Sequence, residues 1–207
     1  MMKIMLVRHG QTEWNNVGKM QGSSEVHLSQ DGLHQARLLA AHCPFHTADA
    51  IYSSPLARAE TTAMILAEKF NLHVEIVPKL RETNFGDWEG KLLRDIAKED
   101  PINFEKFFVQ PDELKIPNAE TFQQTQFRAM EAVQKIINKH SAEKNSHIII
   151  VAHGAVNRTI LCSFLDIPPR KMWSIAQFNT AVNVLREDDG NWIVELVNST
   201  AHLEQTF

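Results

Sequence analysis

The sequence of 207 residues has few cysteines and no long hydrophobic run. Its two cysteines, Cys43 and Cys162, are far apart, which excludes a disulfide framework and a cysteine-rich zinc site. No apolar run reaches the roughly 18 residues that a membrane-spanning helix needs. The apolar start ends at Arg8, and no small-residue cleavage site of a secretion signal follows it. We therefore expect a cytoplasmic protein without a membrane partner.

The sequence also lacks an excess of basic residues. Lys and Arg number 21 and Asp and Glu number 25, so the formal net charge is −4, whereas nucleic-acid binders usually present a strongly basic surface. The length and the balance of 43% hydrophobic and 22% charged residues are typical of one globular domain. We predict a single domain over residues 1–207 that binds no nucleic acid.

Short apolar segments alternate with segments of helical periodicity. Strands are expected over 3–7, 48–52, 74–77 and 147–152, followed by a hairpin over 181–186 and 192–197. Helices are expected over 29–42 with Ser29 as cap, from Ser53-Ser54-Pro55 to 70, over 119–140 and over 154–165. Two short helices over 91–108 should be interrupted at Asp100-Pro101. This alternation predicts an α/β fold, a three-layer sandwich with helices on both faces of a mostly parallel sheet and an antiparallel edge.

Polar side chains follow four of these strands, and open α/β sheets bind ligands beyond the carboxyl ends of their strands. The four strand ends carry, in order, Arg8-His9-Gly10, Ser54-Pro55 with Arg58, Arg81-Glu82, and His153-Gly154. Each feature alone has an ordinary explanation, because a His-Gly pair is a weak motif and a lone arginine or glutamate is commonly a surface side chain. Together, at corresponding strand ends, they predict one functional site.

Two chemistries fit two histidines, two arginines and a glutamate. His9, His153 and Glu82 could be metal ligands, but fixed arginine cations repel a divalent ion. Phosphoryl transfer suits the set better, because arginines bind phosphate oxygens bidentately and a histidine can become phosphorylated. We therefore expect no metal and no cofactor, and a small-molecule phosphate ester as the partner.

Electrostatics predicts a separate role for each group. Nearby arginines should lower the pKa of His9 and keep its ring neutral and nucleophilic. A bound phosphate dianion should repel the carboxylate of Glu82 and favour its protonated, acidic form. His153 borders the same anion and is expected to stay protonated, which would add a charged hydrogen bond.

Five segments, in the right order, resemble the histidine phosphatase superfamily in its phosphoglycerate mutase-like branch. They are Leu6-Val7-Arg8-His9-Gly10-Gln11-Thr12-Glu13-Trp14-Asn15, Ser53-Ser54-Pro55-Leu56-Ala57-Arg58, Leu80-Arg81-Glu82, Gly86-Asp87-Trp88-Glu89-Gly90 and Val151-Ala152-His153-Gly154. The resemblance implies that His9 is the phosphorylated nucleophile and Glu82 the proton donor. It also implies that Arg8, Arg58 and His153 bind the phosphoryl group and that the pocket is lined by Asn15, Gln21, Gly22 and Gly154.

Departures from the family's mutases favour a phosphatase. The mutases continue after the equivalent of Glu82 with Arg-His-Tyr-Gly and carry more basic residues in a longer insert, whereas this chain reads Thr83-Asn84-Phe85-Gly86. Fewer cations should favour release of the dephosphorylated product and attack by water. The chain is similar to broad-specificity and alpha-ribazole phosphatases. Phosphoglycerate mutase and a non-catalytic phospholigand-binding module remain alternatives.

The resemblance places residues of about 91–121 over the site as a small helical cap. In this cap, Phe104, Phe107 and Phe108 either form an apolar wall for the leaving group or only anchor the cap helices, as aromatic residues at helical spacing commonly do. Glu120 is expected to cap the long helix that follows. The natural substrate and the oligomeric state stay open.

Overall fold

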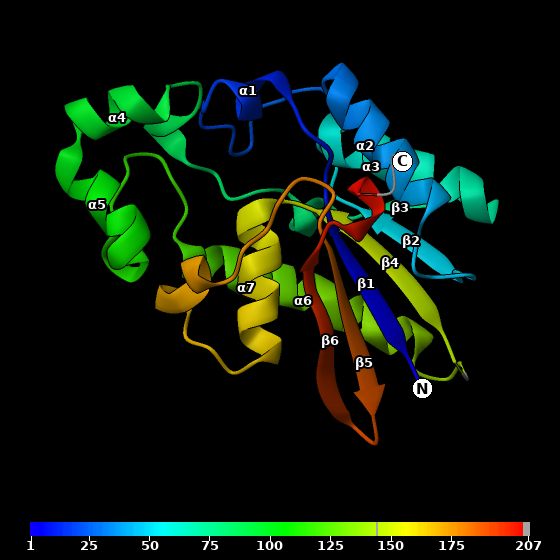
Figure 1. Ribbon diagram of the computed structural model, residues 1–207. Coiled ribbons are helices and arrows are strands. Elements are labelled where there is room, and N and C mark those ends of the chain that lie inside the picture. The colour runs from blue at the N-terminus through cyan, green and yellow to red at the C-terminus, as the bar shows by residue number, and fades with distance from the viewer. Residues whose placement is uncertain (144, 205–207) are drawn as a thin grey trace.

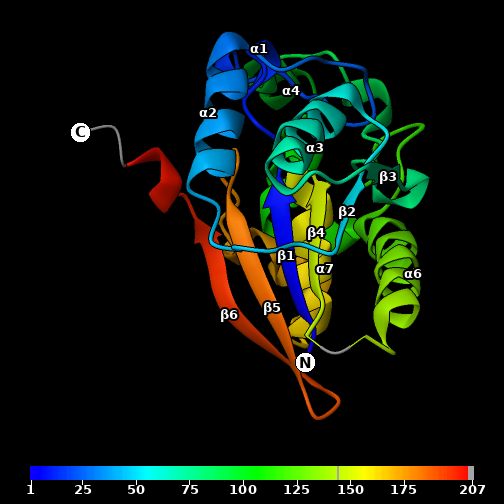
Figure 2. The same cartoon turned by 90° about the vertical axis from the view of Figure 1, so that its right-hand side faces the viewer.

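The computed structural model describes residues 1–143 and 145–204 of the chain. Its centre is a six-stranded sheet in the order β3-β2-β4-β1-β5-β6 (Figures 1 and 2). Strands β1 (Lys3–Arg8), β2 (Ala50–Ser53), β3 (Val74–Ile76) and β4 (His147–Ala152) are parallel, and β5 (Val182–Asp188) and β6 (Asn191–Ser199) form an antiparallel hairpin at one edge. The predicted sheet, mostly parallel with an antiparallel edge, is confirmed.

Four helices bury the two faces of this sheet. Along β1, Ile4 and Leu6 belong to the hydrophobic cluster that includes α6 (Phe122–His140) and α7 (Gly154–Phe164), whereas Met5 and Val7 belong to the cluster that includes α2 (Gln30–Ala41) and α3 (Ala57–Phe70). Successive side chains of a strand point to opposite faces. A strand covered on both faces is therefore apolar throughout, which is why β1 and β4 read as continuous hydrophobic runs.

The helix starts show where local sequence signals held and where they did not. The hydroxyl of Ser29 accepts the Gly32 N–H at 3.1 Å, as predicted for a cap. Helix α3 begins at Ala57 instead of at Pro55, because Ser54 accepts the N–H of Leu56 and shapes a turn ahead of the helix. Helix α6 begins at Phe122 instead of near 119, with a capping box made by Thr121 and Gln124. The capping role predicted for Glu120 is therefore wrong.

The segment after β3 carries two short helices that lie beyond α7 and beside α1 (Glu13–Asn16), a helix of one turn that the sequence analysis missed (Figure 1). They are α4 (Leu93–Glu99) and α5 (Pro101–Val109), and the predicted break between them is confirmed. An isolated bridge joins Lys19, after α1, to Leu92, at the start of α4. Short 3₁₀ turns complete the chain: η1 (Pro78–Leu80), η2 (Gly86–Trp88), η3 (Pro111–Glu113), η4 (Pro169–Ser174) and η5 (Ala201–Leu203).

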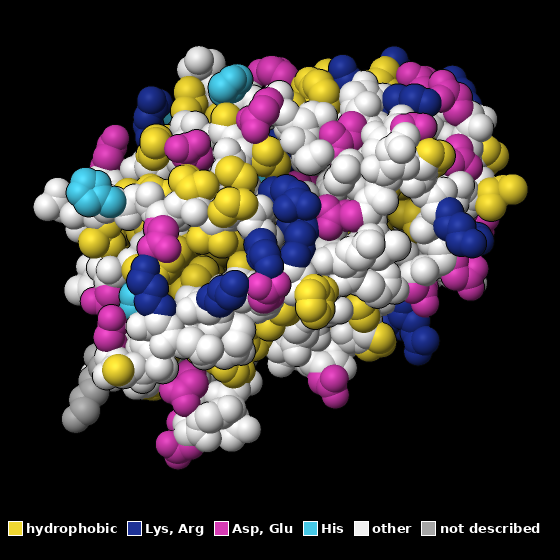
Figure 3. Space-filling model, turned by 180° about the vertical axis from the view of Figure 1, so that it is seen from behind, with side chains coloured by type: hydrophobic (Ala, Val, Ile, Leu, Met, Phe, Trp, Pro, Cys, Tyr) yellow, Lys and Arg dark blue, Asp and Glu magenta, His cyan; other side chains and the backbone are white. Residues whose placement is uncertain are grey.

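Basic and acidic side chains are intermingled on the face of the molecule opposite the view of Figure 1 (Figure 3). Helix α6 carries an ion pair between Lys135 and Glu131 at 3.0 Å, and its Lys139 pairs with Glu75 at 2.6 Å. Exposed pairs of this kind stabilise a fold by at most about 1 kcal/mol each. Within the described part of the chain, no helix combines the length and the hydropathy required to cross a bilayer.

Candidate active site

A cavity of about 250 Å³ lies where β1 and β4 end, between the core and helices α4 and α5. It gathers eight of the nine site residues predicted from the sequence, which are Arg8, His9, Asn15, Gln21, Gly22, Arg58, Glu82 and Gly154. The ninth, His153, is fully buried next to the cavity, with its ring centroid 5.2 Å from that of His9. Parallel strands thus place these distant segments at one edge of the sheet.

His9 is oriented by its own backbone. Its Nδ1 lies 2.6 Å from the carbonyl oxygen of Gly10, and because a carbonyl only accepts, Nδ1 carries the proton. In a neutral ring Nε2 then holds a free lone pair. Burial, together with the charges of Arg58 and Arg8, holds the pKa of His9 well below its ordinary value. The predicted direction is confirmed, with burial as a larger cause than the arginines.

Two arginines supply positive charge to the cavity. The Nη1 of Arg8 donates to the carbonyl of Gln177. Arg58, in the first turn of α3, donates to the carbonyls of Gly22 at 2.6 Å and Ser24 at 2.8 Å. Burial lowers the pKa of Arg58 to about 10, so it remains charged at neutral pH. The Nε of each arginine is buried without a hydrogen-bond partner among the described residues, so both guanidinium groups retain a donor for an anion.

Arg58 also fixes one wall of the cavity. The loop that it binds is held from the other side by Glu89, whose carboxylate accepts the N–H of Ser23 at 2.7 Å and the hydroxyl of Ser24 at 2.7 Å. Gly22 in this loop has a φ of +52°, and a Cβ there would lie 2.1 Å from Glu89 Oε1. The wall therefore needs glycine at this position, both for its backbone conformation and for space.

His153 is buried beside His9 and contacts a serine hydroxyl. Its Nε2 lies 2.7 Å from the hydroxyl of Ser54, while its Nδ1 is buried with no hydrogen-bond partner in the described ranges. Burial, with the charges of Arg58, His9 and Arg8, holds the pKa of His153 well below its ordinary value. This direction applies to the protein alone, and protonation of the ring beside a bound anion stays a prediction. With the Ser54 hydroxyl donating to Nε2, the neutral ring carries its proton on Nδ1 and can still donate one hydrogen bond.

Glu82 is held by backbone N–H groups. Its carboxylate accepts from Thr83 at 2.9 Å, from Ala155 at 3.1 Å and from Val156 at 3.2 Å. Ala155 and Val156 lie in the first turn of α7, where free N–H groups and the helix dipole stabilise negative charge. The protein alone thus stabilises the ionised carboxylate of Glu82.

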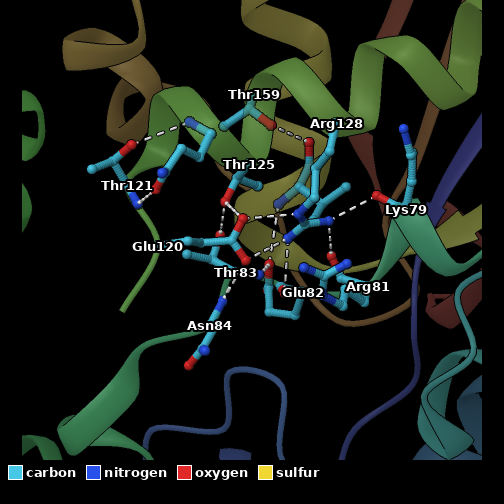
Figure 4. Close-up of polar contacts among 12 residues, drawn as sticks. Lys79, Arg81, Glu82, Thr83, Asn84, Glu120, Thr121, Thr125, Arg128 and Thr159 are labelled. Atoms are coloured by element: carbon cyan, nitrogen blue, oxygen red, sulfur yellow. Dashed lines mark hydrogen bonds and ion pairs between the residues drawn. The ribbon is translucent and has the colours of Figure 1, made fainter. Parts of the chain in front are cut away.

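A buried ion pair supports the backbone around Glu82 (Figure 4). Arg128 of α6 binds the carboxylate of Glu120 through Nε at 2.8 Å and Nη2 at 2.9 Å. The same guanidinium donates to the carbonyls of Lys79 at 2.7 Å, Arg81 at 2.6 Å and Glu82 at 3.0 Å. Arg128 therefore contacts three peptide groups of the short segment that ends at Glu82.

Glu120 extends this support to the residues that follow Glu82. Its carboxylate accepts the N–H of Asn84 at 2.9 Å and the hydroxyl of Thr125 at 3.0 Å, and the Thr125 hydroxyl lies 3.1 Å from that of Thr83. Burial opposes ionisation of Glu120, but hydrogen bonds from Arg128 and Asn84 outweigh it and hold its pKa below the ordinary value. The sequence analysis missed this role, since Glu120 and Arg128 are distant from Glu82 in the chain.

Metal ligation is not a feature of these residues as placed. Among residues 1–143 and 145–204, no three or more His, Cys, Asp or Glu side chains are arranged to hold a metal ion. The two histidines of the cavity instead have Arg8 and Arg58 beside them. A pocket with fixed cations, a neutral imidazole and a carboxylate is suited to bind a phosphate and transfer its phosphoryl group.

Residues 4–200 match the model of the histidine phosphatase superfamily (branch 1). This chain belongs to the histidine phosphatase superfamily. The metal-independent phosphoserine phosphatase of Arabidopsis thaliana is 35% identical to it over 97% of this chain and 83% of the relative. The adenosylcobalamin/alpha-ribazole phosphatase of Salmonella typhimurium is 29% identical over 97% of this chain and 98% of the relative.

Solved structures of histidine phosphatases agree with this fold. YhfR of Bacillus stearothermophilus superimposes with a TM-score of 0.91 and 33% identity, covering 98% of this chain and 100% of that one. A mutant phosphoserine phosphatase of Entamoeba histolytica, in complex with phosphoserine, superimposes with a TM-score of 0.86 and 29% identity. It covers 98% of this chain and 100% of that one. The chain is accordingly a phosphoric monoester hydrolase, and the predicted enzyme class is confirmed.

Several residues that line the cavity of this histidine phosphatase were not predicted. They include Lys19, Arg158 and Trp173. Arg158 lies one turn of helix after Gly154, a spacing that places both on the same face, and this was the one available signal. Lys19 and Trp173 follow irregular segments, in which spacing carries no such information.

The aromatic residues of the cap divide between the two roles considered for them. Phe107 and Phe108 line the cavity, whereas Phe104 packs against Phe108 with ring centroids 5.4 Å apart. Phe107 also anchors the cap, because it is buried and its ring centroid is 4.7 Å from that of Trp173. The same aromatic cluster thus forms an apolar wall of the cavity and anchors the cap helices.

Proposed function

We propose that this phosphatase hydrolyses small phosphomonoesters without a metal ion, through a phosphohistidine intermediate on His9. The observation that carries the proposal is the hydrogen bond from Nδ1 of His9 to the Gly10 carbonyl. It leaves Nε2 as the only nitrogen able to attack, in a ring that burial keeps neutral. Arg8 and Arg58 beside this ring supply the positive charge that stabilises the transferring phosphoryl group.

The first step moves the phosphoryl group to His9. Nε2 forms a bond to phosphorus while the bond from phosphorus to the ester oxygen breaks. The phosphate dianion of the bound ester repels the carboxylate of Glu82, which therefore takes up a proton on binding and gives it to the leaving oxygen. In this proposal, the Nδ1–H of His153, which has no partner among the described residues, donates to a phosphoryl oxygen throughout.

The second step returns the enzyme to its starting state. Glu82, now a carboxylate, removes a proton from water as the water attacks phosphorus. The bond between phosphorus and Nε2 breaks and its electron pair returns to Nε2, so His9 is again neutral. As inorganic phosphate leaves, Glu82 releases the proton taken from water to the solvent and is again a carboxylate. A divalent metal ion has no role in either step, because the arginines already neutralise the phosphoryl oxygens. The similarity to the Arabidopsis relative, a metal-independent phosphoserine phosphatase, supports this assignment.

The size of the cavity supports a small leaving group. Its volume of about 250 Å³ falls just below the range of about 300–1,000 Å³ typical of pockets for drug-sized ligands. Phosphoserine, named in the Arabidopsis relative and the Entamoeba complex, suits this space better than the bulkier alpha-ribazole phosphate. Phosphoserine is therefore the first substrate to test, and 3-phosphoglycerate tests the mutase alternative by whether it is isomerised or hydrolysed.

The intermediate can be trapped directly. Rapid quenching with ³²P-labelled substrate in alkali should leave label on the protein, and acid should release it, as expected of phosphohistidine. His9→Ala should abolish both labelling and hydrolysis, while His34→Ala, an exposed histidine of α2, should change neither. Activity should survive EDTA. Loss of activity in EDTA with rescue by a divalent metal would overturn the proposal, and binding of phosphate without any hydrolysis would favour a non-catalytic module.

A further inference from the structure

We propose that Arg158 binds a carboxylate of the substrate beside the phosphoryl pocket, so that the enzyme prefers phosphomonoesters with a carboxylate close to the ester oxygen. This inference rests on the proposed function and names the substrate class for it. Phosphoserine belongs to this class, with its carboxylate only two carbons away from the ester oxygen. The argument depends on the position of the Arg158 guanidinium, on its charge and on its remaining hydrogen-bond donors.

The guanidinium of Arg158 is held rigidly at the cavity wall. Nη1 donates to the carbonyl of Gly154 at 3.0 Å, and Nε donates to the carbonyl of Ile175 at 2.7 Å. The guanidinium carbon lies 4.8 Å from the ring centroid of Trp173, a cation–π contact. These three contacts occupy Nε, one N–H of Nη1 and one face of the planar guanidinium. Nη2 has no acceptor among the residues that the structure describes, and Arg158 has no carboxylate partner within them.

Arg158 is next to the residues that hold the phosphoryl group. A Cβ built on Gly154 would lie 3.2 Å from Arg158 Nη1 and 3.5 Å from Arg8 Nε. Both guanidinium groups therefore flank the same side of Gly154, and the absence of a side chain leaves room for them. An ester whose phosphate contacts Arg8 would bring a carboxylate on its second carbon into the neighbourhood of Arg158.

The charge of Arg158 remains available for an anion. Burial, and then the nearby charge of Arg8, lower the pKa of Arg158 to about 10 against the opposing charge of Glu82, which leaves Arg158 protonated at neutral pH. Two guanidinium groups this close repel each other, and an anion bound beside them relieves that repulsion. A planar guanidinium also matches the two oxygens of a carboxylate. Lys19, the other unpredicted cation, has its ammonium 4.2 Å from the centroid of the Trp14 ring. An ammonium is a point charge and does not present two parallel N–H donors to a carboxylate.

A purely structural role of Arg158 can be distinguished from carboxylate binding by comparing substrates. Arg158 joins α7 to the segment around Ile175, and a variant that only loosened this contact would weaken hydrolysis of every substrate alike. A carboxylate-binding role affects only substrates that have the carboxylate. Phosphoserine and phosphoethanolamine form a matched pair, because they differ only in that group.

The test compares kcat and KM for this pair in the wild type, Arg158→Met and Arg158→Lys. The control is Arg170→Met, which removes an exposed arginine of η4. Wild type should prefer phosphoserine. Arg158→Met should raise its KM for phosphoserine about 10- to 100-fold, the loss expected for a hydrogen bond to a charged group. Its KM for phosphoethanolamine should change less than about twofold. The KM of Arg158→Lys for phosphoserine should lie between those of wild type and Arg158→Met.

Two results would overturn this inference. One is a wild type without preference for phosphoserine, and the other is an equal rise in KM for both substrates in Arg158→Met. In either case, hydrolysis of phosphoethanolamine that His9→Ala abolishes would leave the proposed function intact. If wild type hydrolysed neither ester nor any other phosphomonoester, the proposed function and the carboxylate subsite would fail together.

Discussion

Removing Arg128 should affect stability and activity by separate routes. In Arg128→Met, the carboxylate of Glu120 remains buried without its counter-charge, and the carbonyls of Lys79, Arg81 and Glu82 lose a donor. Breaking a buried ion pair by deleting one partner costs about 3–5 kcal/mol. A domain of this size has about 5–15 kcal/mol of stability in total, so the variant should fold but unfold at much lower urea concentration.

The same change should slow catalysis. Glu82 keeps its three N–H donors to the carboxylate, but the backbone that carries it loses its anchor. A misplacement of about 1 Å at a catalytic group can reduce the rate about 100-fold. We therefore expect kcat to fall by about that factor, with a smaller effect on KM, when a phosphomonoester is assayed below the unfolding transition.

A double variant separates the two effects. Glu120→Met with Arg128→Met removes both charges, and replacing a buried ion pair by apolar residues is commonly close to neutral for stability. Urea unfolding should therefore return toward the wild-type midpoint, while kcat stays low because the three carbonyls remain without a donor. The positioning role is refuted if kcat recovers together with stability, or if Arg128→Met leaves kcat unchanged.

Three further predictions follow from other contacts. Burial lowers the pKa of His202 to about 4, so the unfolded chain binds this proton first and stability should fall as pH drops from about 6.5 to 4. Urea midpoints measured over this range should decline less steeply in His202→Asn, and an unchanged slope would contradict this reasoning. Gly10→Ala would place a Cβ 2.5 Å from the Gly32 carbonyl oxygen, a backbone clash that should lower both activity and the melting temperature, and wild-type values for both would show that the backbone adjusts freely. Ser54→Ala removes the hydroxyl that contacts the ring of His153 and accepts the Leu56 N–H and should lower kcat about 10-fold, whereas unchanged kcat would show that this hydroxyl is not needed.

The sequence predicted the part of the site that depends on strand ends. His9 and His153 follow apolar strands directly and Arg58 lies in the first turn of the helix after β2. The geometry of parallel strands brings such positions together whatever the length of chain between them. The hydrophobic runs that define those strands are strong local signals. The same reasoning located Glu82, although its strand is only three residues long.

Contacts between side chains on separate elements could not be predicted. The pairing of Glu120 with Arg128, and the reach of Arg128 to the carbonyls before Glu82, depend on how α6 crosses the loop after β3. The contact between His153 and the Ser54 hydroxyl was likewise not predicted, because it joins two segments that are distant in the chain. The start of α3 was misplaced because the Ser54 hydroxyl accepts the N–H of Leu56 in a turn ahead of the helix and also contacts His153.

The loop of residues 21–24, held by Arg58 on one side and Glu89 on the other, means that this half of the cavity is already in its binding shape. A ligand that enters loses little further freedom of the protein there. Variation in substrate choice among related chains is therefore expected to arise on the opposite half, where a single partly exposed ring such as Phe108 can be exchanged without disturbing the chemistry.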